Sequence, residues 1–507
     1  MQPVKKKVCL TDSTNLQSLN MEQNKKITWF EGIVNPEIEE ANPLLSWIWC
    51  GFLFLLGMFL WGYFLNFGKI PFDFHDWAEV NAPRIAFLKD AVTKGVLPLH
   101  MQDASALRGV TDRYMALPDV LLSPQILLLK WLDVGDFILI HTWLLYAIGF
   151  WGLYRLKKSM HLSLFGFTWF FLLFYFNGHI TSHYAVGHIT WGGYFLFPWF
   201  VYLVIRMING DHSWKWVAKI SFLLFFMFLQ GSFHQFIWCL LFLAFLALTG
   251  RKNLFTVLKA GMFSCLLSMV RIIPPALQAS AFDDDFLGGF TSPIQLIRSF
   301  IQIIPPSESL NSAVTGGNLG WWEFDHYIGV SGALFLLIFG ILWLKNRRKE
   351  TGYPAILVPM IVLTLFSIGK FYGIFRLLPI PLFSGERVSA RFLILPLVFL
   401  MAEAVYAMQQ SMEIRKFDVL SVSIPLLILL FGLPEFWSHL ETWKVLNAFQ
   451  AFPYTYTDLT IKTVANHPDP SYTNGLLIGM VITILTAILL AGLVWRENRH
   501  TKNILVP

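Results

Sequence analysis

The chain contains 507 residues, of which 55% are hydrophobic and 14% charged, and its mean hydropathy is +0.56. A soluble domain has about 25% charged residues, so a chain this poor in charge is not an ordinary water-soluble protein. Its net charge of +6 comes from short basic clusters between apolar runs, which is the pattern of membrane topology and not of nucleic-acid binding. Its four cysteines form neither a disulfide framework nor a zinc pattern.

Twelve apolar runs are long enough, or nearly so, to cross about 30 Å of hydrocarbon. They are 44–66, 137–155, 162–176, 191–208, 217–230, 233–249, 253–270, 328–344, 354–369, 391–408, 418–433 and 474–495. The first run is too long, and begins too far from the N-terminus, to be a cleaved signal peptide. We therefore expect an all-α polytopic membrane protein with about 12 transmembrane helices.

Basic residues mark every second connection between these runs. Lys157, Lys158 and the cluster 345–349 fall in short connections, whereas the alternate connections are longer and rich in aromatic residues. The positive-inside rule places the short basic connections and both termini in the cytoplasm. We expect a multi-pass protein of a bacterial inner or plasma membrane, with its chemically capable loops on the outer side.

This orientation divides the chain into three parts. A cytoplasmic tail (1–43) precedes a transmembrane module (44–433), and 434–507 forms an outer loop, the last span and a cytoplasmic tail. The outer loops of the module are 67–136, 177–190, 271–327 and 370–390, and the last outer loop is 434–473.

The first outer loop contains two amphipathic stretches. In 79–95, Ile85 and Leu88 share one helical face, and Pro83 suits a first helical turn. The second stretch, 117–133, is apolar but interrupted by polar residues and a proline. We expect both to be helices lying in the outer interface. The alternative, that 117–133 is a thirteenth span, would invert the topology of everything after it.

The same loop opens with acidic residues directly after the first span, in the sequence Asp73-Phe-His75-Asp76-Trp77. Carboxylates at the point where a span meets water can act as general bases or hold a divalent metal. The alternative is that Asp73 and Asp76 only cap the helix that follows, since acidic residues favour a first helical turn.

Arg387 and Arg391 lie four residues apart at the start of a span, which predicts that they share one helical face. The free N–H groups of a helix N-terminus favour anions, and two guanidiniums there can clamp a phosphate. The alternatives are interfacial snorkelling and ion pairing with Glu386.

Three histidines, His179, His183 and His188, lie in the short loop 177–190, where the sequence Gly-His-Ile-Thr occurs at 178 and again at 187. They can bind a metal, but no acidic or Cys ligands lie beside them in the sequence. Hydrogen bonding to a sugar, a phosphate or other loops is the alternative that we favour.

The loop 271–327 combines acidic and aromatic residues. It contains an acidic triplet, 283–285, and the run Trp321-Trp322-Glu323-Phe-Asp325. Carbohydrate sites often place aromatic faces beside carboxylates, although interface aromatics and solvated acids would look similar.

In their order along the chain, these features resemble YfhO-like proteins of the GT-C superfamily of membrane glycosyltransferases. In that family an acidic residue after the first span precedes an interfacial helix and a G-x-L-P-L-W turn. Gly95-Val-Leu-Pro-Leu99 resembles this turn, with His100 where the family usually has Trp. The Tyr-Ile-Gly at 327–329 and the Arg-x-x-x-Arg-Phe at 387–392 also resemble the family. The resemblance covers roughly residues 44–410.

The resemblance implies a GT-C-like fold and the transfer of a sugar from a polyprenyl-phosphate donor on the outer face of the lipid bilayer. It implies that Asp76 is the catalytic base, with Asp73 as its nearest rival. Arg387 and Arg391 would bind the donor phosphate, with Lys370 as a helper. The large soluble C-terminal domain of some relatives is missing here, so we expect a lipid-linked or polymeric glycan acceptor.

Further outer-loop residues are candidates for substrate binding: His179, His188, Trp322 and Glu323. We assign no metal ligand and no certain cofactor, and the use of a divalent metal stays open.

Two other functions remain possible on the sequence. A transporter or flippase of a lipid-linked anionic substrate would place paired ionisable residues within its spans. The candidates there, His141, His234 and Glu403, show no paired arrangement. The other alternative is an inactive scaffold subunit that kept the fold.

Overall fold

A computed structural model describes residues 29–278, 287–305, 310–311, 318–347, 353–377, 386–451 and 462–504. In these residues the chain is helical apart from turns, loops, isolated bridges and one antiparallel pair of two-residue strands, β1 (Leu310–Asn311) and β2 (Asn318–Leu319). The acidic triplet 283–285 lies outside the described residues.

Each of the twelve apolar runs contains a helix. In chain order these are α4 (Pro43–Phe64), α6 (Val134–Ser159), α7 (Leu164–Tyr175), α9 (Phe197–Ile208), α10 (Trp214–Leu229), α11 (Phe233–Ala247), α12 (Arg251–Leu267), α15 (Gly329–Arg347), α16 (Tyr353–Ser367), α19 (Ile394–Ile414), α20 (Val419–Trp443) and α22 (Pro470–Ile504). Side-chain caps define several of the starts: Asn42 accepts from Leu45 N, and Ser213 accepts from Trp216 N.

Among the described residues, seven helices are long and apolar enough to cross a membrane, or eight if α12 and α13 (Met269–Ala276), bent by 69°, form one span. The protein is therefore a multi-pass integral membrane protein. The prediction of twelve spans is confirmed only in part. The helices α10, α11 and α16 have 15 or 16 residues, whereas a straight crossing needs about 20.

Short elements fill the connections. The remaining α-helices are α2 (Trp29–Val34), α3 (Pro36–Ala41), α5 (Ala82–Lys94), α8 (Gly178–Ala185), α14 (Pro293–Ile301), α17 (Gly369–Arg376) and α21 (Val445–Ala451). The 3₁₀-helices are η1 (Asn66–Gly68), η3 (Ala104–Leu107), η4 (Tyr114–Ala116), η5 (Pro124–Lys130), η6 (Ile189–Leu196), η8 (Trp321–Glu323) and η9 (Ser389–Leu393), and η2 (Trp77–Asn81) is a π-helical turn.

The first outer loop agrees with one prediction and contradicts the other. Helix α5 forms with Pro83 in its first turn, and Gly95 ends it in the left-handed region at φ 66°. Its apolar residues Ile85 and Leu88 are buried within the protein. The predicted helix 117–133 is wrong, since only the seven residues of η5 are helical there. Seven residues of 3₁₀-helix reach about 14 Å, so a thirteenth span is ruled out.

Two boundaries also differ from prediction. The short loop 177–190 is largely helical, because α8 continues the direction of α7 and the two count as one apolar segment, Leu164–Ala185. At the other boundary, α20 runs ten residues beyond the predicted end of its span at 433, to Trp443.

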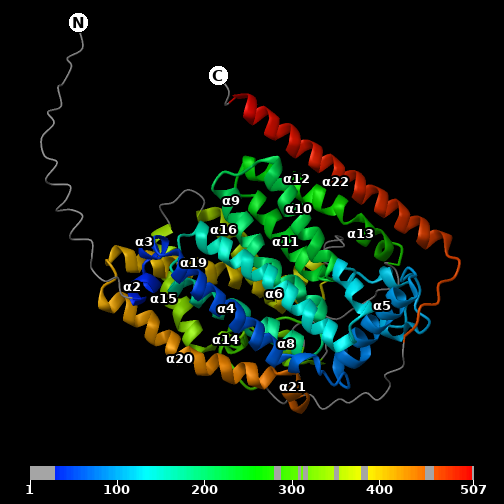
Figure 1. The fold of residues 1–507 in the computed structure, drawn as a ribbon, viewed down its shortest axis with the longest axis horizontal. Helices are drawn as coiled ribbons and strands as arrows, with labels where there is room; N and C mark the ends of the chain where they lie inside the picture. Colours follow the sequence, from blue (N-terminus) through cyan, green and yellow to red (C-terminus); the bar gives the residue numbers. More distant parts are fainter. Residues whose placement is uncertain are drawn as a thin grey trace, which may run out of the picture.

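The core of the bundle and its rim differ in burial. In the most apolar window of 164–185, 94% of residues are buried, against 17% in that of α22. Figure 1 shows α22 lying across α10, α12 and α13, which it contacts. Many apolar residues on its other side, such as Leu477 and Leu485, are exposed and suit contact with lipid.

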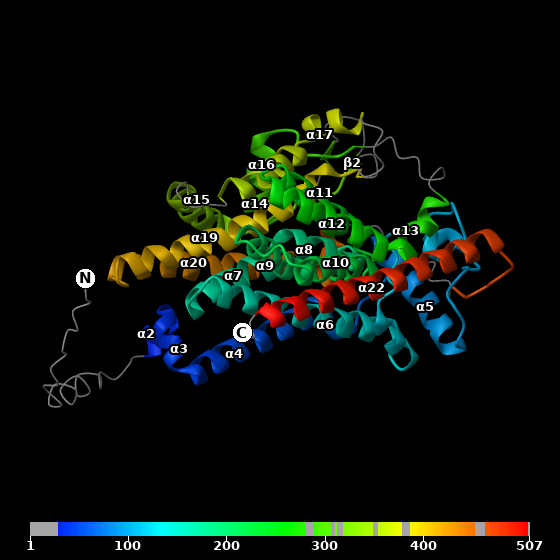
Figure 2. The same cartoon turned by 90° about the horizontal axis from the view of Figure 1, so that it is seen from above.

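The predicted outer segments contact one another. The loop 67–136 meets 177–190 through Trp77 and Ala185, and it meets 434–473 through His100 and Ala465. The loops 271–327 and 370–390 join in a bridge between Gly288 and Val388. Figure 2 shows α5 at one end of the bundle and α2 and α3 at the other.

Predicted inner segments also contact one another. Lys157 pairs with Glu39 at 2.6 Å, and Asn35, His161 and Glu413 line one cavity. The outer segments thus contact one another, and so do the inner segments, as the predicted alternation of inner and outer loops requires. The assignment of one set to the cytoplasm stays a prediction.

Candidate functional site

The backbone directly after α4 is shaped to present His75 and Asp76. Phe72 and His75 have positive φ angles of 53° and 45°. The left-handed region is uncommon for residues with side chains and costs free energy, although His adopts it more readily than most. The strained turn leads into η2, and Asp76 makes no side-chain capping hydrogen bond to it. Capping therefore does not explain Asp76.

Both copies of the Gly-His-Ile-Thr sequence mark close approaches between loops. A Cβ on Gly187, whose φ is 101°, would lie 2.5 Å from the backbone N of Trp77. A Cβ on Gly178 would overlap the carboxylate of Asp325. Glycine at 187 lets the chain pass against the Asp76–Trp77 peptide, and this brings His188 to Asp76.

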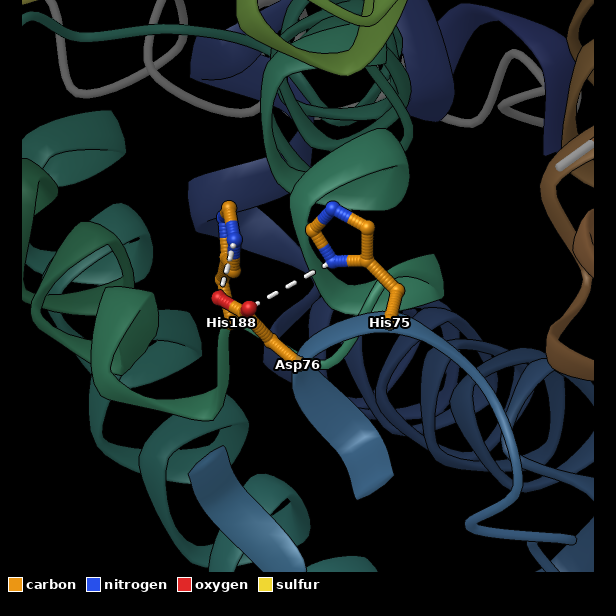
Figure 3. A group of neighbouring side chains, drawn as sticks. All are labelled: His75, Asp76 and His188. Carbon is orange, nitrogen blue, oxygen red and sulfur yellow. Dashed lines mark ion pairs between the residues drawn. The ribbon is translucent and has the colours of Figure 1, made fainter. Parts of the chain in front are cut away.

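Asp76 lies between two imidazoles, one on either side of its carboxylate (Figure 3). His188 Nε2 is 2.9 Å from Oδ2, and His75 Nδ1 is 3.6 Å from Oδ1. The side chains of His75, Asp76 and His188 are 23%, 28% and 11% exposed, so the group is reachable from solvent. We call these three residues the junction cluster.

The pKa of Asp76 lies well below its ordinary value. Burial alone would raise this pKa, but the hydrogen bond from His188 and the charges of His188, His75 and Arg84 outweigh burial. For His75, burial is the largest cause of a lowered pKa, which favours its neutral form. Asp76 is therefore an ionised carboxylate at neutral pH.

The predicted histidine loop is buried in layers behind this carboxylate. His183 Nδ1 lies 2.7 Å from His188 Nδ1. Deeper still, His179 is 1% exposed, and within the described residues neither of its ring nitrogens has a hydrogen-bond partner. The ring of His179 lies 4.8 Å from that of His183 and 5.2 Å from that of His326.

Arg391 is buried beside Trp191, and it is already paired with carboxylates. Its Nε and Nη2 each lie 2.6 Å from the carboxylate of Glu323, and Nη1 is 3.6 Å from Glu386. Its guanidinium also lies 4.9 Å from the ring of Trp191. Burial would raise the pKa of Glu323, but Arg391 holds it below the ordinary value. The alternative of an Arg–Glu386 ion pair holds for Arg391, with Glu323 as the closer partner.

These residues close into one network. Trp322 contacts the ring of His75 at 4.5 Å and donates to Glu323, which pairs with Arg391. On the other side, Trp191 stacks on His183 at 4.1 Å, and His183 reaches His188. The network therefore links residues of three outer loops with Trp191 in η6 and Arg391 in η9, and its most exposed part is the junction cluster.

Arg387 and Lys370 lie near the two sides of a short extended segment, 288–290. Arg387 is partly exposed and its charge lowers the pKa of Glu323, but it precedes η9, so it does not share a helical face with Arg391 as predicted. Lys370 is exposed on α17. Backbone hydrogen bonds hold this segment, since Gly288 N donates to Arg387 O and Phe290 N donates to Ser367 O.

One residue considered unpaired on the sequence has a partner. His234 Nδ1 lies 2.9 Å from Glu386, which also accepts from Trp238 Nε1 at 2.9 Å. Burial raises the pKa of Glu386, but the charge and hydrogen bond of His234 and the charge of Arg391 bring it to about 2. The interior therefore holds more paired ionisable groups than the sequence suggested.

A second group of histidines and carboxylates lies where residues 462–469, which we call the strap, cross the first outer loop. Within the described residues, the donor atoms of His, Cys, Asp or Glu converge to within 4.8 Å in two groups: the junction cluster and the group of His100, Asp112 and His467. We call the second group the strap cluster. The predicted trio His179, His183 and His188 does not form such a group in this part of the chain.

The strap is fixed by several contacts with the first outer loop. Ala465 N donates to His100 O, and Asp469 accepts from Arg113 Nε at 2.6 Å and Nη2 at 3.0 Å. Lys462 pairs with Asp103. His100, which stands where the resembling family usually has Trp, is thus buried under the strap.

Sequence reasoning selected Asp76 and His188 separately and missed His75, Gly187 and Trp191 as parts of one site. The repeat of Gly-His-Ile-Thr was the available signal, because a repeated glycine before a histidine marks a close backbone approach. No family model, curated protein or solved structure matches this chain.

Proposed function

We propose that the protein transfers a sugar from a polyprenyl-phosphate carrier to a lipid-linked or polymeric glycan on the outer face of the membrane, in the manner of the GT-C enzymes that it resembles. One observation supports this most. Asp76 is a partly exposed, ionised carboxylate at the junction of the loops that also carry Trp322, Glu323 and Arg391. The sequence predicted all four as site residues or substrate contacts, although they are far apart along the chain.

In this proposal Asp76 accepts the proton of the acceptor hydroxyl. The hydroxyl oxygen forms a bond to the anomeric carbon while the bond from that carbon to the donor phosphate oxygen breaks, and the electron pair stays on the phosphate. A carboxylate with a low pKa is a weak base. His188, in contact with Asp76, can carry the proton onward.

The charge of Arg391 is balanced by Glu323, so in this proposal Arg391 holds Glu323 and Trp191 in place. The departing phosphate then depends on Arg387, with Lys370 as a helper, because fixed cations stabilise the charge that develops. Trp322 offers a half-buried aromatic face beside His75 for a sugar ring. His179 is too deeply buried to reach a substrate without movement of the loops.

The direct test is transfer of radiolabel from a panel of polyprenyl-phosphate sugars to envelope glycans, with the purified protein in lipid nanodiscs. Asp76→Asn should lose at least 100-fold in rate, since general-base catalysis contributes about 10²–10⁴-fold. Asp112→Asn in the strap cluster is the matched control and should transfer as the wild type does. Equal transfer by Asp76→Asn and wild type, or no transfer from any donor, would count against the proposal.

A proton-coupled transporter is the second candidate, and a specific observation favours it. The rings of His188, His183, His179 and His326 follow one another at 5.0, 4.8 and 5.2 Å. In the part of the chain that the structure describes, four of their buried nitrogens have no hydrogen-bond partner. Chains of ionisable side chains serve as proton relays in transporters. Proton uptake into proteoliposomes that needs His179 and occurs without sugar transfer would favour this function.

A further inference from the structure

We propose that the junction cluster binds one divalent transition-metal ion through His75, Asp76 and His188. The inference adds a cofactor to the proposed site, but it rests on the donor geometry, and the ion would bind whether or not the reaction is sugar transfer.

The three donor atoms are placed as ligands of one ion would be. Two donors about 2.0–2.1 Å from a tetrahedral zinc ion lie about 3.3 Å apart. The carboxylate of Asp76 lies 2.9 Å from His188 Nε2 and 3.6 Å from His75 Nδ1. All three donor atoms lie within 4.8 Å of one another, so side-chain movements of a fraction of an ångström to about one ångström would suffice.

The orientation of the two imidazoles also fits. Their ring centroids are 6.0 Å apart and the rings are inclined at 55°. Imidazoles that bind the same ion point their nitrogens at a common centre and splay apart behind it. Figure 3 shows both rings turned toward the Asp76 carboxylate, each facing a different oxygen.

A layer of hydrogen bonding behind the donors supports His188 as a ligand. Metal-bound histidines almost always use their second nitrogen in a hydrogen bond, which fixes the tautomer. His188 Nδ1 makes this contact with His183 Nδ1 at 2.7 Å. When an ion binds, His188 donates from Nδ1 to His183, and its Nε2 turns a lone pair to the ion in place of the hydrogen bond that it otherwise gives to Asp76.

His75 must give up one hydrogen bond to bind the ion. Its Nδ1 lies 3.3 Å from the carbonyl of Val186. Binding through Nδ1 therefore requires the neutral tautomer that carries its proton on Nε2, and Nδ1 turns from Val186 toward Asp76. Protonation of the ring competes with the ion. Metal affinity should consequently fall as the pH falls.

The negative charge of Asp76 is not balanced when its two histidine partners are neutral. Both ion-pair partners of Asp76 in the described chain are histidines, which are neutral when they bind a metal. Among the described residues Asp76 forms no ion pair with a lysine or an arginine, although the charge of Arg84 acts on its carboxylate. A divalent ion would supply positive charge that neutral imidazoles do not.

The donor set also indicates the class of ion. Two imidazoles and one carboxylate suit Zn²⁺, Co²⁺, Fe²⁺ or Mn²⁺ better than Mg²⁺ or Ca²⁺, which prefer oxygen ligands. Three protein ligands leave at least one position open, as in catalytic and not structural zinc sites. That position can take an acceptor hydroxyl or a phosphate oxygen and lower the pKa of the hydroxyl.

The test measures binding and needs no substrate. Full-length protein in nanodiscs is stripped with a chelator, equilibrated with Co²⁺ or Zn²⁺, and analysed for bound metal and for the visible absorption of protein-bound Co²⁺. We expect one tightly bound ion in the wild type, with the absorption of a site containing nitrogen ligands. His75→Ala, Asp76→Asn and His188→Ala should each lower the affinity at least 100-fold.

Two further variants make the result specific. His183→Gln should weaken binding about 10- to 100-fold, as loss of a supporting hydrogen bond does. His467→Ala in the strap cluster should bind the ion as the wild type does. Thermal melting of each variant in chelator checks folding, and X-ray absorption of the bound ion in the wild type should show two imidazole ligands.

Absence of a tightly bound ion in the wild type, or equal binding by the three ligand variants that fold, would overturn the inference. Failure of the proposed function looks different, because the ion would bind as expected while no donor sugar is transferred.

Discussion

The junction cluster and the strap cluster have the same composition, two histidines and an aspartate, and comparable spacing between donor atoms. Their rings differ. In the junction cluster the imidazoles are 6.0 Å apart and inclined at 55°, whereas in the strap cluster they are 3.9 Å apart at 32°, close to stacked. Stacked rings direct their nitrogens along similar lines and do not converge on an ion.

The carboxylates differ as well. In the strap cluster Asp112 accepts from His467 at 2.7 Å, and the neighbouring Asp469 is engaged by Arg113. Asp112 and His467 are 42% and 51% exposed, in a region where charges are screened by water. The strap cluster therefore fastens one segment to another, while the junction cluster presents a partly buried carboxylate to a ligand. Ring orientation and existing hydrogen-bond partners, and not composition, therefore distinguish a binding site from a contact that only holds two segments together.

The largest expected effect concerns the buried ion pair of Glu323 and Arg391, which belongs to the same network as the junction cluster. Glu323→Ala leaves the buried guanidinium of Arg391 without its main partner, and loss of one member of a buried ion pair costs about 3–5 kcal/mol. We expect a correspondingly lower midpoint in chemical denaturation. The double variant Glu323→Leu/Arg391→Met removes both charges and should recover much of the loss. Equal destabilisation by the single and double variants would show that the unpaired charge of Arg391 does not cause the loss of stability.

The next effect tests the close approach that forms the junction. Gly187→Ala adds a Cβ 2.5 Å from the backbone of Trp77 at a positive φ, so we expect a loss of about 1–3 kcal/mol and of metal binding at the junction. Gly210→Ala is the matched control, since Gly210 has a φ of 100° with nothing within 4 Å of the added atom. Similar unfolding free energies for the two variants would mean that the approach to Trp77 does not matter.

A smaller effect should separate the strap from the junction. Asp469→Asn weakens the paired contact with Arg113, whose partners are partly exposed, so we expect a loss of about 1 kcal/mol. Metal binding and sugar transfer should stay unchanged in this variant. A loss of either activity would make the strap part of the functional site and would remove the contrast between the two clusters.

The smallest effect is a difference in pH dependence. The hydrogen bond to Asp112 raises the pKa of His467 above its ordinary value of 6.5, so this contact stabilises the fold below that pH and the contribution is lost as the pH rises through the raised value. The pKa of Asp76 is lowered from 3.8, because His188 outweighs burial, so its contribution is present above 3.8 and lost on acidification.

The measurement is the melting temperature of wild type and His467→Gln on both sides of pH 6.5. The two proteins should differ at the acidic side and converge at the alkaline side. A difference that grows with pH would contradict the role given to Asp112.

Much of the fold followed from local sequence. Each apolar run predicted a helix that the structure contains, although α20 extends ten residues beyond its predicted end, and Pro83 lies in the first turn of α5 as predicted. The helix predicted for 117–133 did not form, because its proline and polar residues allow only a short 3₁₀ turn, η5. The segment before η5 is held by Arg271, which donates to the carbonyls of Leu117 and Val120. A buried arginine that binds backbone carbonyls leaves no periodic pattern to detect.

The sequence by itself determined where helices form, that several of them can cross a membrane, and which polar residues stand beside them, since hydropathy, charge and helix signals are properties of neighbouring residues. Only the tertiary structure decided which of those residues meet. Asp76 and His188 come together because Gly187 allows two backbones to touch, and Arg391 is neutralised by Glu323, 68 residues away. Such contacts depend on the packing of whole helices, so composition and spacing alone leave the junction and strap clusters indistinguishable.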